Sequence, residues 1–317
     1  MKVLITGAAG NLGSHLALYL MNCKEKPDLR LMIHKTSLSY SIEGFKNVEI
    51  CRSDLSKPEM LQETCKNIDC IVHFAGVLFA PRPEKFLPVT NIKYFQNLVN
   101  AAIDAKVKKI ILISFPHVEG NTSPERPANG RLNGSPVSVH AETRLKEEQY
   151  LFDKCKDSNT TPVSLRPGMI YGKNILMVDA GIWLMKKWLL GVWKKPTWIH
   201  LISIDDFLEA TKQAIIKNGI TRIYQLGDEK PLYIQDFYDI QAAHLGYKKP
   251  WRMPKWCIFT AAGLVEFYAR IFNTKSPLTK DFIRIGMVSY TGDISRMKAE
   301  LLPVLKYPDI QSGIKIL

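Results

Sequence analysis

Near its N-terminus the sequence reads Val3-Leu4-Ile5-Thr6-Gly7-Ala8-Ala9-Gly10-Asn11-Leu12-Gly13. The first four of these residues are apolar or β-branched, which is typical of a buried strand. From Gly13 onward, apolar residues at positions 16, 20 and 21 predict a helix. Glycines between a strand and a helix allow a tight turn, and the helix N-terminus attracts phosphate. The stretch therefore predicts a site for a dinucleotide pyrophosphate, whereas a purely structural turn would need only one glycine.

Downstream of this stretch, short β-rich runs alternate with longer helical patterns. Strands are expected at residues 29–33, 48–51, 70–75, 109–114 and 163–166, and helices at residues 57–66, 84–105 and 138–156. Strands separated by helices predict βαβ units and a parallel sheet. The strands are apolar throughout, as strands covered on both faces must be. The predicted fold class is α/β, a Rossmann-type doubly wound parallel sheet with a smaller, mainly helical C-terminal lobe.

The pattern changes after about residue 166, which divides the chain into two predicted domains. Residues 1–166 are expected to form a dinucleotide-binding domain, and residues 167–317 a substrate-binding lobe. Within that lobe, two segments near residues 199–226 are expected to return to the edge of the sheet. They are residues 199–203 and 222–226.

Composition narrows the classes of function. The 317 residues are 46% apolar and carry a formal net charge of +13. This charge indicates solubility, or attraction to a polyanion, a phosphate-bearing ligand or an anionic membrane surface. The six cysteines form no CxxC pair, so we expect free thiols and no metal site. We find no signal peptide, and the apolar run from Trp256 to Val265 is too short to cross a bilayer, so we expect a cytoplasmic protein.

The glycine spacing is G-x-x-G-x-x-G, and shorter motifs follow it in order: Asp54-Leu55, His73-Phe74-Ala75-Gly76, Thr90-Asn91, Arg166-Pro167-Gly168-Met169-Ile170-Tyr171-Gly172 and Ile204-Asp205-Asp206. With these motifs the chain resembles the extended short-chain dehydrogenase/reductase family, in its epimerase/dehydratase branch. The resemblance implies a homodimer through the helices at residues 84–105 and 138–156. It also implies cofactor contacts from Asp54 and Leu55 at the adenine, Ala75 and Gly76 at the nicotinamide, Pro167 and Gly168 behind the carboxamide, and Asn91.

The residues after the second strand bear on the choice of dinucleotide. NAD-binding proteins place an acid there to hold the ribose 2′-hydroxyl, but this chain reads Ile33-His34-Lys35-Thr36, with no acid before Glu43. A carboxylate would repel a 2′-phosphate, whereas His34 and Lys35 can pair with it. We expect NADP(H) as the cofactor. NAD(H) is the alternative, since Lys35 could simply point into solvent.

The family's hydride chemistry uses Tyr-x-x-x-Lys on the helix after the fifth strand, with a Ser or Thr after that strand. The corresponding helix here reads Ser138-Val139-His140-Ala141-Glu142-Thr143-Arg144-Leu145-Lys146-Glu147-Glu148. Aligned on Thr143 and Glu148, the family pattern puts His140 at the Tyr position and Arg144 at the Lys position. Upstream, Phe115 stands where the hydroxyl residue is expected, and Ser114 is one residue away.

These substitutions leave two interpretations open. In the first the chain is an oxidoreductase that exchanges hydride with a carbonyl or alcohol of a small, largely apolar substrate. His140 would be the acid or base, because imidazole titrates near neutrality. Arg144 would keep that ring neutral and bind the ribose, and Ser114 would supply a hydroxyl. In the second, hydride transfer is lost, and the chain is an NADP-binding sensor or regulator. A nucleotide-sugar epimerase or dehydratase is a further alternative.

The second half of the chain offers features for a substrate. All six tryptophans lie there, among the lysine pairs at 186–187, 194–195 and 248–249. They suit either ordinary core packing or an aromatic cleft with a positive rim for a small-molecule substrate. Residues 250–273 could instead rest on a membrane surface, which is the less favoured interpretation. No basic run exceeds two residues, so we expect no nucleic-acid partner.

Overall fold

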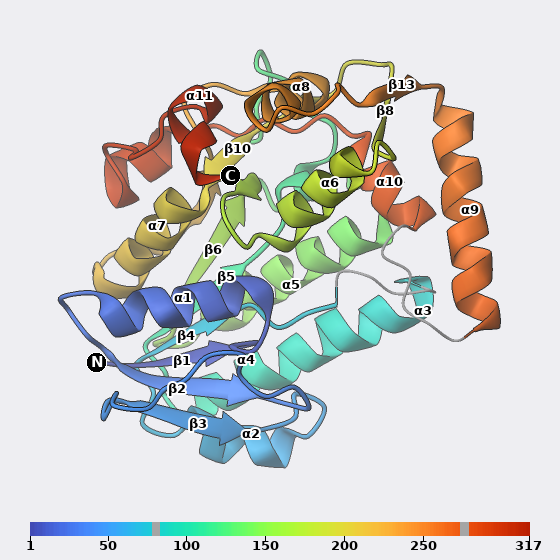
Figure 1. Ribbon diagram of the computed structural model, residues 1–317. Helices are drawn as coiled ribbons and strands as arrows, with labels where there is room; N and C mark the ends of the chain where they lie inside the picture. Colours follow the sequence, from blue (N-terminus) through green and yellow to red (C-terminus); the bar gives the residue numbers. More distant parts are fainter. Residues whose placement is uncertain (78–82, 273–278) are drawn as a thin grey trace.

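The computed structural model describes residues 1–77, 83–272 and 279–317, and its centre is a seven-stranded parallel sheet (Figure 1). Across the sheet the strands are β11 (Ile223–Leu226), β6 (Thr161–Pro167), β5 (Lys109–Ile113), β4 (Cys70–His73), β1 (Lys2–Thr6), β2 (Asp28–Ile33) and β3 (Val48–Arg52). The predicted α/β class and doubly wound sheet are confirmed. The strand order reverses between β1 and β4, and a reversal of this kind opens a crevice for ligands at the carboxyl ends of the strands.

Helices cover both faces of the sheet. One layer contains α1 (Asn11–Asn22) and α7 (Ile204–Ile216), and the other contains α2 (Pro58–Cys65), α4 (Tyr94–Asp104) and α5 (Val139–Cys155). Successive side chains of a strand point to opposite faces. Accordingly, Val3 and Ile5 of β1 belong to the apolar cluster under α1 and α7, while Leu4 belongs to the cluster under α2 and α4. Because helices cover both faces of the sheet, strands such as β1 do not alternate apolar with polar residues.

The helix expected over residues 84–105 is three consecutive elements. They are α3 (Pro83–Leu87), the π-helical turn η1 (Pro88–Lys93) and α4. Pro88 lacks an N–H for the preceding turn, and the wider π turn begins at this residue. The helix expected over residues 138–156 is α5, which starts after Ser138. The Ser138 hydroxyl accepts a hydrogen bond from the Ala141 N–H and so caps the helix.

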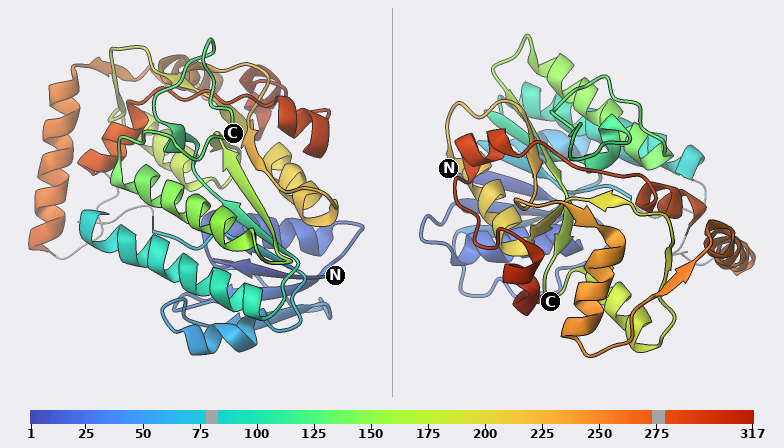
Figure 2. Two further views of the ribbon diagram at one scale, coloured as in Figure 1. Left: turned by 180° about the vertical axis from the view of Figure 1, so that it is seen from behind. Right: turned by 90° about the horizontal axis from the view of Figure 1, so that it is seen from above.

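The C-terminal half adds short strands and helices at one end of the sheet (Figure 2). In chain order these are β7 (Met169–Tyr171), α6 (Leu176–Lys186), β8 (Gly191–Trp193), β9 (Trp198–Ile199), β10 (Leu201–Ser203), β12 (Leu232–Tyr233), α8 (Ile234–His244), β13 (Trp251–Met253), α9 (Lys255–Ile271), α10 (Lys280–Gly286) and α11 (Ile310–Gly313). Three shorter turns complete the structure: η2 (Pro116–Glu119), η3 (Met297–Leu301) and η4 (Ile314–Ile316).

Only one of the two segments expected at the sheet edge lies there. Strand β11 pairs with β6 and forms the end of the main sheet. The expectation for residues 199–203 is wrong, because β9 pairs with β12 and β10 pairs with β7 in separate two-stranded ladders. His200 lies between β9 and β10, and its buried ring bonds to the Asp228 carbonyl and the Gly292 N–H. These bonds tie the segment to the lobe instead of the main sheet.

Candidate functional site

The turn between β1 and α1 needs its glycines for steric reasons. Gly7 has a φ of 72°, and the Gly10 N–H donates to its carbonyl over 2.8 Å. A Cβ on Gly13 would lie 2.3 Å from the Gly7 oxygen, and one on Gly7 would lie 2.9 Å from the Ala75 nitrogen. The first turn of α1 contains no acidic residue, so the positive end of the helix is not offset locally. The turn therefore presents close-packed backbone and an unneutralised helix N-terminus.

A cleft of about 600 Å³ opens beside this turn, at the carboxyl ends of β1, β2, β3 and β4. Eight residues predicted for the cofactor line it: Gly7, Gly10, His34, Lys35, Asp54, Leu55, Ala75 and Gly76. Sequence reasoning missed other lining residues, including Ala9, Thr36, Ser53, Ser56, Val77 and Tyr94. Most of these adjoin a predicted residue, so the motif positions located the cleft but not its full extent.

The remaining residues predicted for the cofactor are not among those that line the cleft. Asn11 bridges from α1 to the loop before α6, because its side chain donates to the Asn174 carbonyl and accepts from the Leu176 N–H. Asn91 is buried, accepts from the Val77 N–H over 3.1 Å and donates to the Thr143 hydroxyl. Leu12 packs against the apolar core, Pro167 ends β6, and a Cβ on Gly168 would lie 2.1 Å from the His200 oxygen.

The end of the cleft beyond β2 carries mixed charge. Lys35 is exposed, and the His34 Nε2 lies 3.4 Å from a carboxylate oxygen of Asp54. The Ser56 backbone N–H bonds to Asp54 and lowers the pKa of that carboxyl. Asp54 follows β3, however, and the position directly after β2 holds His34 and Lys35. The acid that would hold a ribose hydroxyl after β2 is therefore absent from this part of the described chain.

Helix α5 places His140 and Arg144 directly behind the cleft wall. They are one turn apart on the helix, and both are buried. The Arg144 Nη2 sits against Gly76, where a Cβ would lie only 2.2 Å from it. His140 interacts with the backbone of Val77. Since Gly76 and Val77 both line the cleft, these two side chains meet it at neighbouring points.

The imidazole of His140 is held in its neutral form. Burial is the main cause, and the charge of Arg144 and the nearby His117 ring add to it, so the pKa of His140 falls to about 3. Its Nδ1 has no hydrogen-bond partner among the described residues. A neutral ring with an unpartnered nitrogen can bond to a ligand oxygen, but it is a weak base by itself.

Arg144 has a partner that sequence reasoning did not identify. Its Nη1 donates to Glu147 over 2.8 Å, and the carboxylate of Glu147 is fully buried. Burial outweighs the attraction of Arg144 and raises the pKa of Glu147 to about 7. Its second oxygen, Oε1, has no partner among the described residues. The i,i+3 spacing of this pair on one helix face was a signal that could have revealed it.

After β5 come Ser114, the predicted hydroxyl residue, and Phe115, whose ring contacts His140. Ser114 is buried, and its hydroxyl has no partner within the described residues. The Phe115 ring lies edge-on against the His140 ring, with 4.8 Å between their centroids, and also contacts His117. Burial lowers the pKa of His117 to about 4, so this ring is neutral too. The His140 ring therefore packs against an aromatic neighbour, while the Asp281 carboxyl bonds to the backbone N–H groups of Val139 and His140.

Comparison with protein families identifies the chain. The model of the NAD dependent epimerase/dehydratase family matches residues 3–184, which include the glycine turn, the cleft and α5. The chain belongs to this family. Curated relatives include an uncharacterized protein of Methanocaldococcus jannaschii, 24% identical over 271 residues, which are 78% of this chain and 82% of the relative. Another is a dTDP-D-glucose 4,6-dehydratase of Dictyostelium discoideum, 24% identical over 260 residues, 72% of this chain and 58% of the relative.

Solved structures of epimerases and dehydratases share the fold. The UDP-glucuronic acid 4-epimerase of Bacillus cereus, in complex with UDP-glucuronic acid and NAD, matches with a TM-score of 0.78 and 20% identity, covering 100% of this chain and 97% of that one. The dTDP-glucose 4,6-dehydratase of Streptomyces venezuelae, with NAD bound, matches with a TM-score of 0.78 and 16% identity, covering 100% and 95%. At these identities the likeness establishes the epimerase/dehydratase fold.

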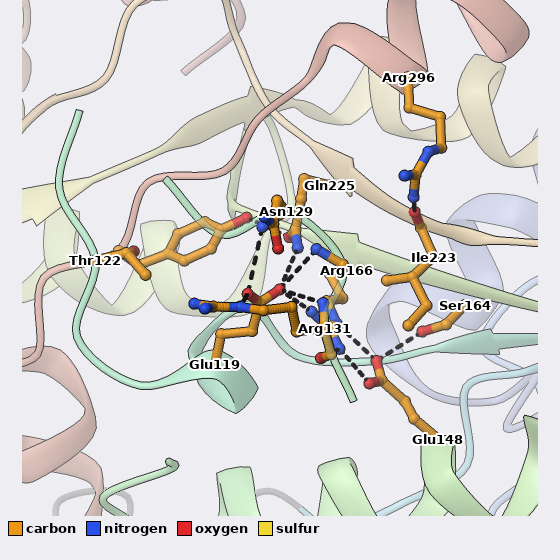
Figure 3. Close-up of polar contacts among 12 residues, drawn as sticks. Glu119, Thr122, Asn129, Arg131, Glu148, Ser164, Arg166, Ile223, Gln225 and Arg296 are labelled. Atoms are coloured by element: carbon orange, nitrogen blue, oxygen red, sulfur yellow. Dashed lines mark hydrogen bonds and ion pairs between the residues drawn. The ribbon is translucent and has the colours of Figure 1, made fainter. Parts of the chain in front are cut away.

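Behind the site of this epimerase/dehydratase family member, a buried ion network joins three elements. Arg166 of β6 lies between Glu119 of η2 and Glu148 of α5, and all three side chains are fully buried (Figure 3). Glu119 also accepts hydrogen bonds from the backbone N–H groups of residues 129–131 and from Gln225, while Glu148 accepts one from the Ser164 hydroxyl. The network fixes α5, and with it His140 and Arg144, relative to the sheet.

Metal ligands are not grouped in the part of the chain that the structure describes. Within residues 1–77, 83–272 and 279–317, no three His, Cys, Asp or Glu side chains come together in a way that could hold a metal ion.

Proposed function

We propose that the chain is an NADP(H)-dependent oxidoreductase that acts on a carbonyl or alcohol of a small, largely apolar substrate. The observation that carries this proposal is the position of His140 and Arg144 behind Gly76 and Val77, two residues of the cleft wall. The glycine turn fits a pyridine dinucleotide, because side chains at Gly7 and Gly13 would collide with backbone. A bound dinucleotide would supply or accept the hydride.

Each residue of the site has a role that follows from its chemistry. The N–H groups at the start of α1 would hold the pyrophosphate, and Asp54 and Leu55 would lie at the adenosine end. Arg144 would provide fixed positive charge and hydrogen bonds at the ribose end, held in position by Glu147. Neutral His140, whose Nδ1 has no partner among the described residues, would accept a hydrogen bond from a substrate hydroxyl without carrying charge. Phe115, in the place of a hydroxyl residue, favours an apolar substrate.

The preference for NADP(H) is supported by Lys35 and His34 at the mouth of the cleft. A 2′-phosphate there would gain a charge-assisted contact with Lys35 that a 2′-hydroxyl cannot make. Isothermal titration calorimetry with NADPH and NADH should show tighter binding of NADPH by about tenfold. In Lys35→Glu this preference should disappear or reverse. Tighter binding of NADH by the unaltered protein would contradict the proposal.

A second experiment tests the role of His140. In a screen of small ketones and aldehydes with NADPH, His140→Phe should lower turnover by about a hundredfold or more, since a placed acid, base or hydrogen-bond donor contributes at least that much. NADPH affinity should stay within about twofold, because the cleft itself is lined by other residues. Unchanged turnover in His140→Phe would remove this residue from the mechanism.

A nucleotide-sugar epimerase or dehydratase is the second candidate, favoured by relatives of the family that are named for those activities. Incubation with UDP- and dTDP-linked sugars, followed by chromatography of the products, separates it from the first. Conversion of a nucleotide sugar without net consumption of NADPH would favour this candidate. Dinucleotide binding without turnover of either substrate class would instead favour a sensor or regulatory role.

A further inference from the structure

Helix α9 exposes large apolar side chains along its outward face. Figures 1 and 2 show this helix at the outer edge of the molecule, apart from the layers that cover the sheet. Trp256 is 70% exposed, Leu264 66% and Phe267 63%, and Tyr268 and Ile271 are also exposed. Successive positions are eight, three, one and three residues apart, which keeps all five on one side of a helix. The exposed apolar residues therefore form a stripe on the outward face, in which the exposed Thr260 lies between Trp256 and the other four.

The inward face of α9 already has its own packing. It buries the small or medium residues Ile258, Ala262 and Ala269, and Glu266 accepts the Lys280 N–H at the start of α10. A helix that is apolar on both faces is normally packed against other molecules or other parts of the protein on both faces. Among the helices of the described residues, none has the length and apolar character that crossing a bilayer requires. The outward stripe therefore suits an interface and not a membrane span.

Two aromatic residues continue the apolar surface at the N-terminal end of α9. Strand β13 leads into this helix and pairs with β8. Trp251 of β13 stacks on Trp188, with 4.3 Å between the ring centroids, and its indole N–H donates to the Trp188 carbonyl. Both tryptophans and Leu189 are exposed. Of the six tryptophans, Trp193 is buried and bonded to Thr197, so the aromatic residues of this lobe do not all form core.

The surface around these residues is strongly basic. Residues 182–204 and 240–265 together contain seven lysines and one arginine but no acid. Lys186, Lys187, Lys194, Lys195 and Lys255 are all exposed. Lys248 lies over the Trp188 ring, 4.8 Å from its centroid. The acids that adjoin these segments include Asp239, which is paired with Lys249 and Arg252, and Glu266 of α9, which accepts the Lys280 N–H. We call the outward stripe of α9, with Trp188, Leu189, Trp251 and these lysines, the basic–aromatic surface.

We propose that the basic–aromatic surface docks on a bilayer that contains anionic phospholipids. Large apolar side chains on one helix face can enter the boundary between headgroups and acyl chains, and lysines beside them gain from negative surface potential. A second copy of the chain is a poorer occupant, because a symmetric contact would bring the same lysines together. The segment considered from the sequence, residues 250–273, contains Trp251 and the exposed stripe of α9, while residue 273 lies outside the described residues. This inference does not depend on the proposed activity.

Vesicle co-sedimentation of the full chain tests the proposal. One set of vesicles is phosphatidylcholine alone, and the other is an equal mixture of phosphatidylcholine and phosphatidylglycerol. The protein should pellet with the mixed vesicles only, and added salt should release it, because salt screens the lysines. In Trp256→Glu/Phe267→Glu and in Lys194→Glu/Lys195→Glu, the apparent affinity should fall by about tenfold or more. All four side chains are exposed, so these variants should fold.

The control variants also replace an exposed apolar residue or exposed lysines with glutamate, but at positions outside the basic–aromatic surface. Val304→Glu alters an 80% exposed apolar residue after η3, which is not part of the basic–aromatic surface. Lys24→Glu/Lys46→Glu reverses two exposed lysines near β2. Both should pellet like the unaltered protein, and NADPH affinity should be the same in every variant. Absence of binding to mixed vesicles, or equal binding by Trp256→Glu/Phe267→Glu, would overturn the proposal. A dimer that this variant splits, seen by light scattering without vesicle binding, would assign the surface to a second copy.

Discussion

Burial shifts the pKa of two residues on α5 in opposite directions, and the direction follows from the charge of each ionised form. The imidazole of His140 becomes charged by gaining a proton, so burial lowers its pKa to about 3. The carboxyl of Glu147 becomes charged by losing one, so burial raises its pKa to about 7. At neutral pH the imidazole is thus uncharged, and the carboxyl is near its midpoint.

The first prediction concerns the ionisation of His140. Nuclear magnetic resonance spectra of protein with labelled histidine should show ring signals of His140 that stay constant between about pH 5 and pH 8, because the ring is neutral throughout this range. Comparison with His140→Phe assigns the signals. A midpoint near pH 6.5 for the assigned signals would show that the ring is solvated and would weaken its proposed role.

The second prediction concerns the pH dependence of stability through Glu147. The folded state raises the pKa of this carboxyl to about 7, so its proton stabilises the folded state fully below the ordinary pKa near 4.5. This contribution is lost as the pH rises through 7. Glu147→Gln keeps an acceptor for Arg144 and cannot ionise. Its free energy of unfolding, relative to the unaltered protein, should therefore increase by roughly 1–3 kcal/mol between pH 4.5 and pH 8.

Urea unfolding at several pH values measures this difference. Glu142→Gln is the control, since it removes an exposed carboxylate from the same helix. The relative stability of the control should change much less with pH. A Glu147→Gln protein that loses stability, relative to the unaltered protein, as the pH rises would mean that the ionised pair with Arg144 outweighs burial.

At the scale of elements, Arg166 connects β6 with η2 and α5. Its guanidinium bonds to the buried carboxylates of Glu119 and Glu148 and to the Arg131 carbonyl. The third prediction is that Arg166→Met destabilises the protein by about 3–5 kcal/mol, because two buried carboxylates lose their cation. Arg131→Met should cost about 1 kcal/mol or less, since Arg131 is mostly exposed and the backbone donors to Glu119 remain. Equal costs in urea unfolding would contradict this account.

The sequence predicted most elements of the sheet domain because their patterns are local. Strand β1, the glycine turn and α1 are adjacent in the chain, and apolar runs mark the other strands. The Arg166 network was not predicted, because its partners are 18 and 47 residues away in the sequence. For the same reason no local pattern indicated that Phe115 would contact His140. The short strand β9 was misplaced because its partner, β12, lies in a later segment.

At the site, too, features set by neighbouring residues were predictable from the sequence, and features set by distant contacts were not. The motif positions from Gly7 to Gly76 were found from a few neighbouring residues at a βα turn and at strand ends, and these parts of the chain line the cleft. The substitutions at His140 and Arg144 were visible in the sequence, but their burial was not. Burial depends on the whole fold, and it determines that His140 is neutral and that Glu147 titrates near pH 7.

At the scale of the whole molecule, the cleft joins the ends of four neighbouring strands, so a ligand in it should stabilise the sheet as a unit. The fourth prediction is that NADPH at about a hundred times its dissociation constant raises the free energy of unfolding by about 2.7 kcal/mol. For a chain of this size, that gain corresponds to a rise of about 3–8 °C in Tm. Differential scanning calorimetry at equal dinucleotide concentrations should give a smaller rise in Tm with NADH. Only NADPH has a 2′-phosphate with which Lys35 can pair.

Lys35→Glu separates the possible outcomes of this experiment. The variant should keep the rise with NADH and lose most of the rise with NADPH, since Lys35 lines the cleft, is exposed and forms no hydrogen bond or ion pair within the described residues. Equal rises with both dinucleotides in the unaltered protein would place cofactor choice at another residue, with Arg52 beside His34 as the next candidate. No rise with either would mean that the glycine turn and cleft, despite their fit, do not hold a pyridine dinucleotide.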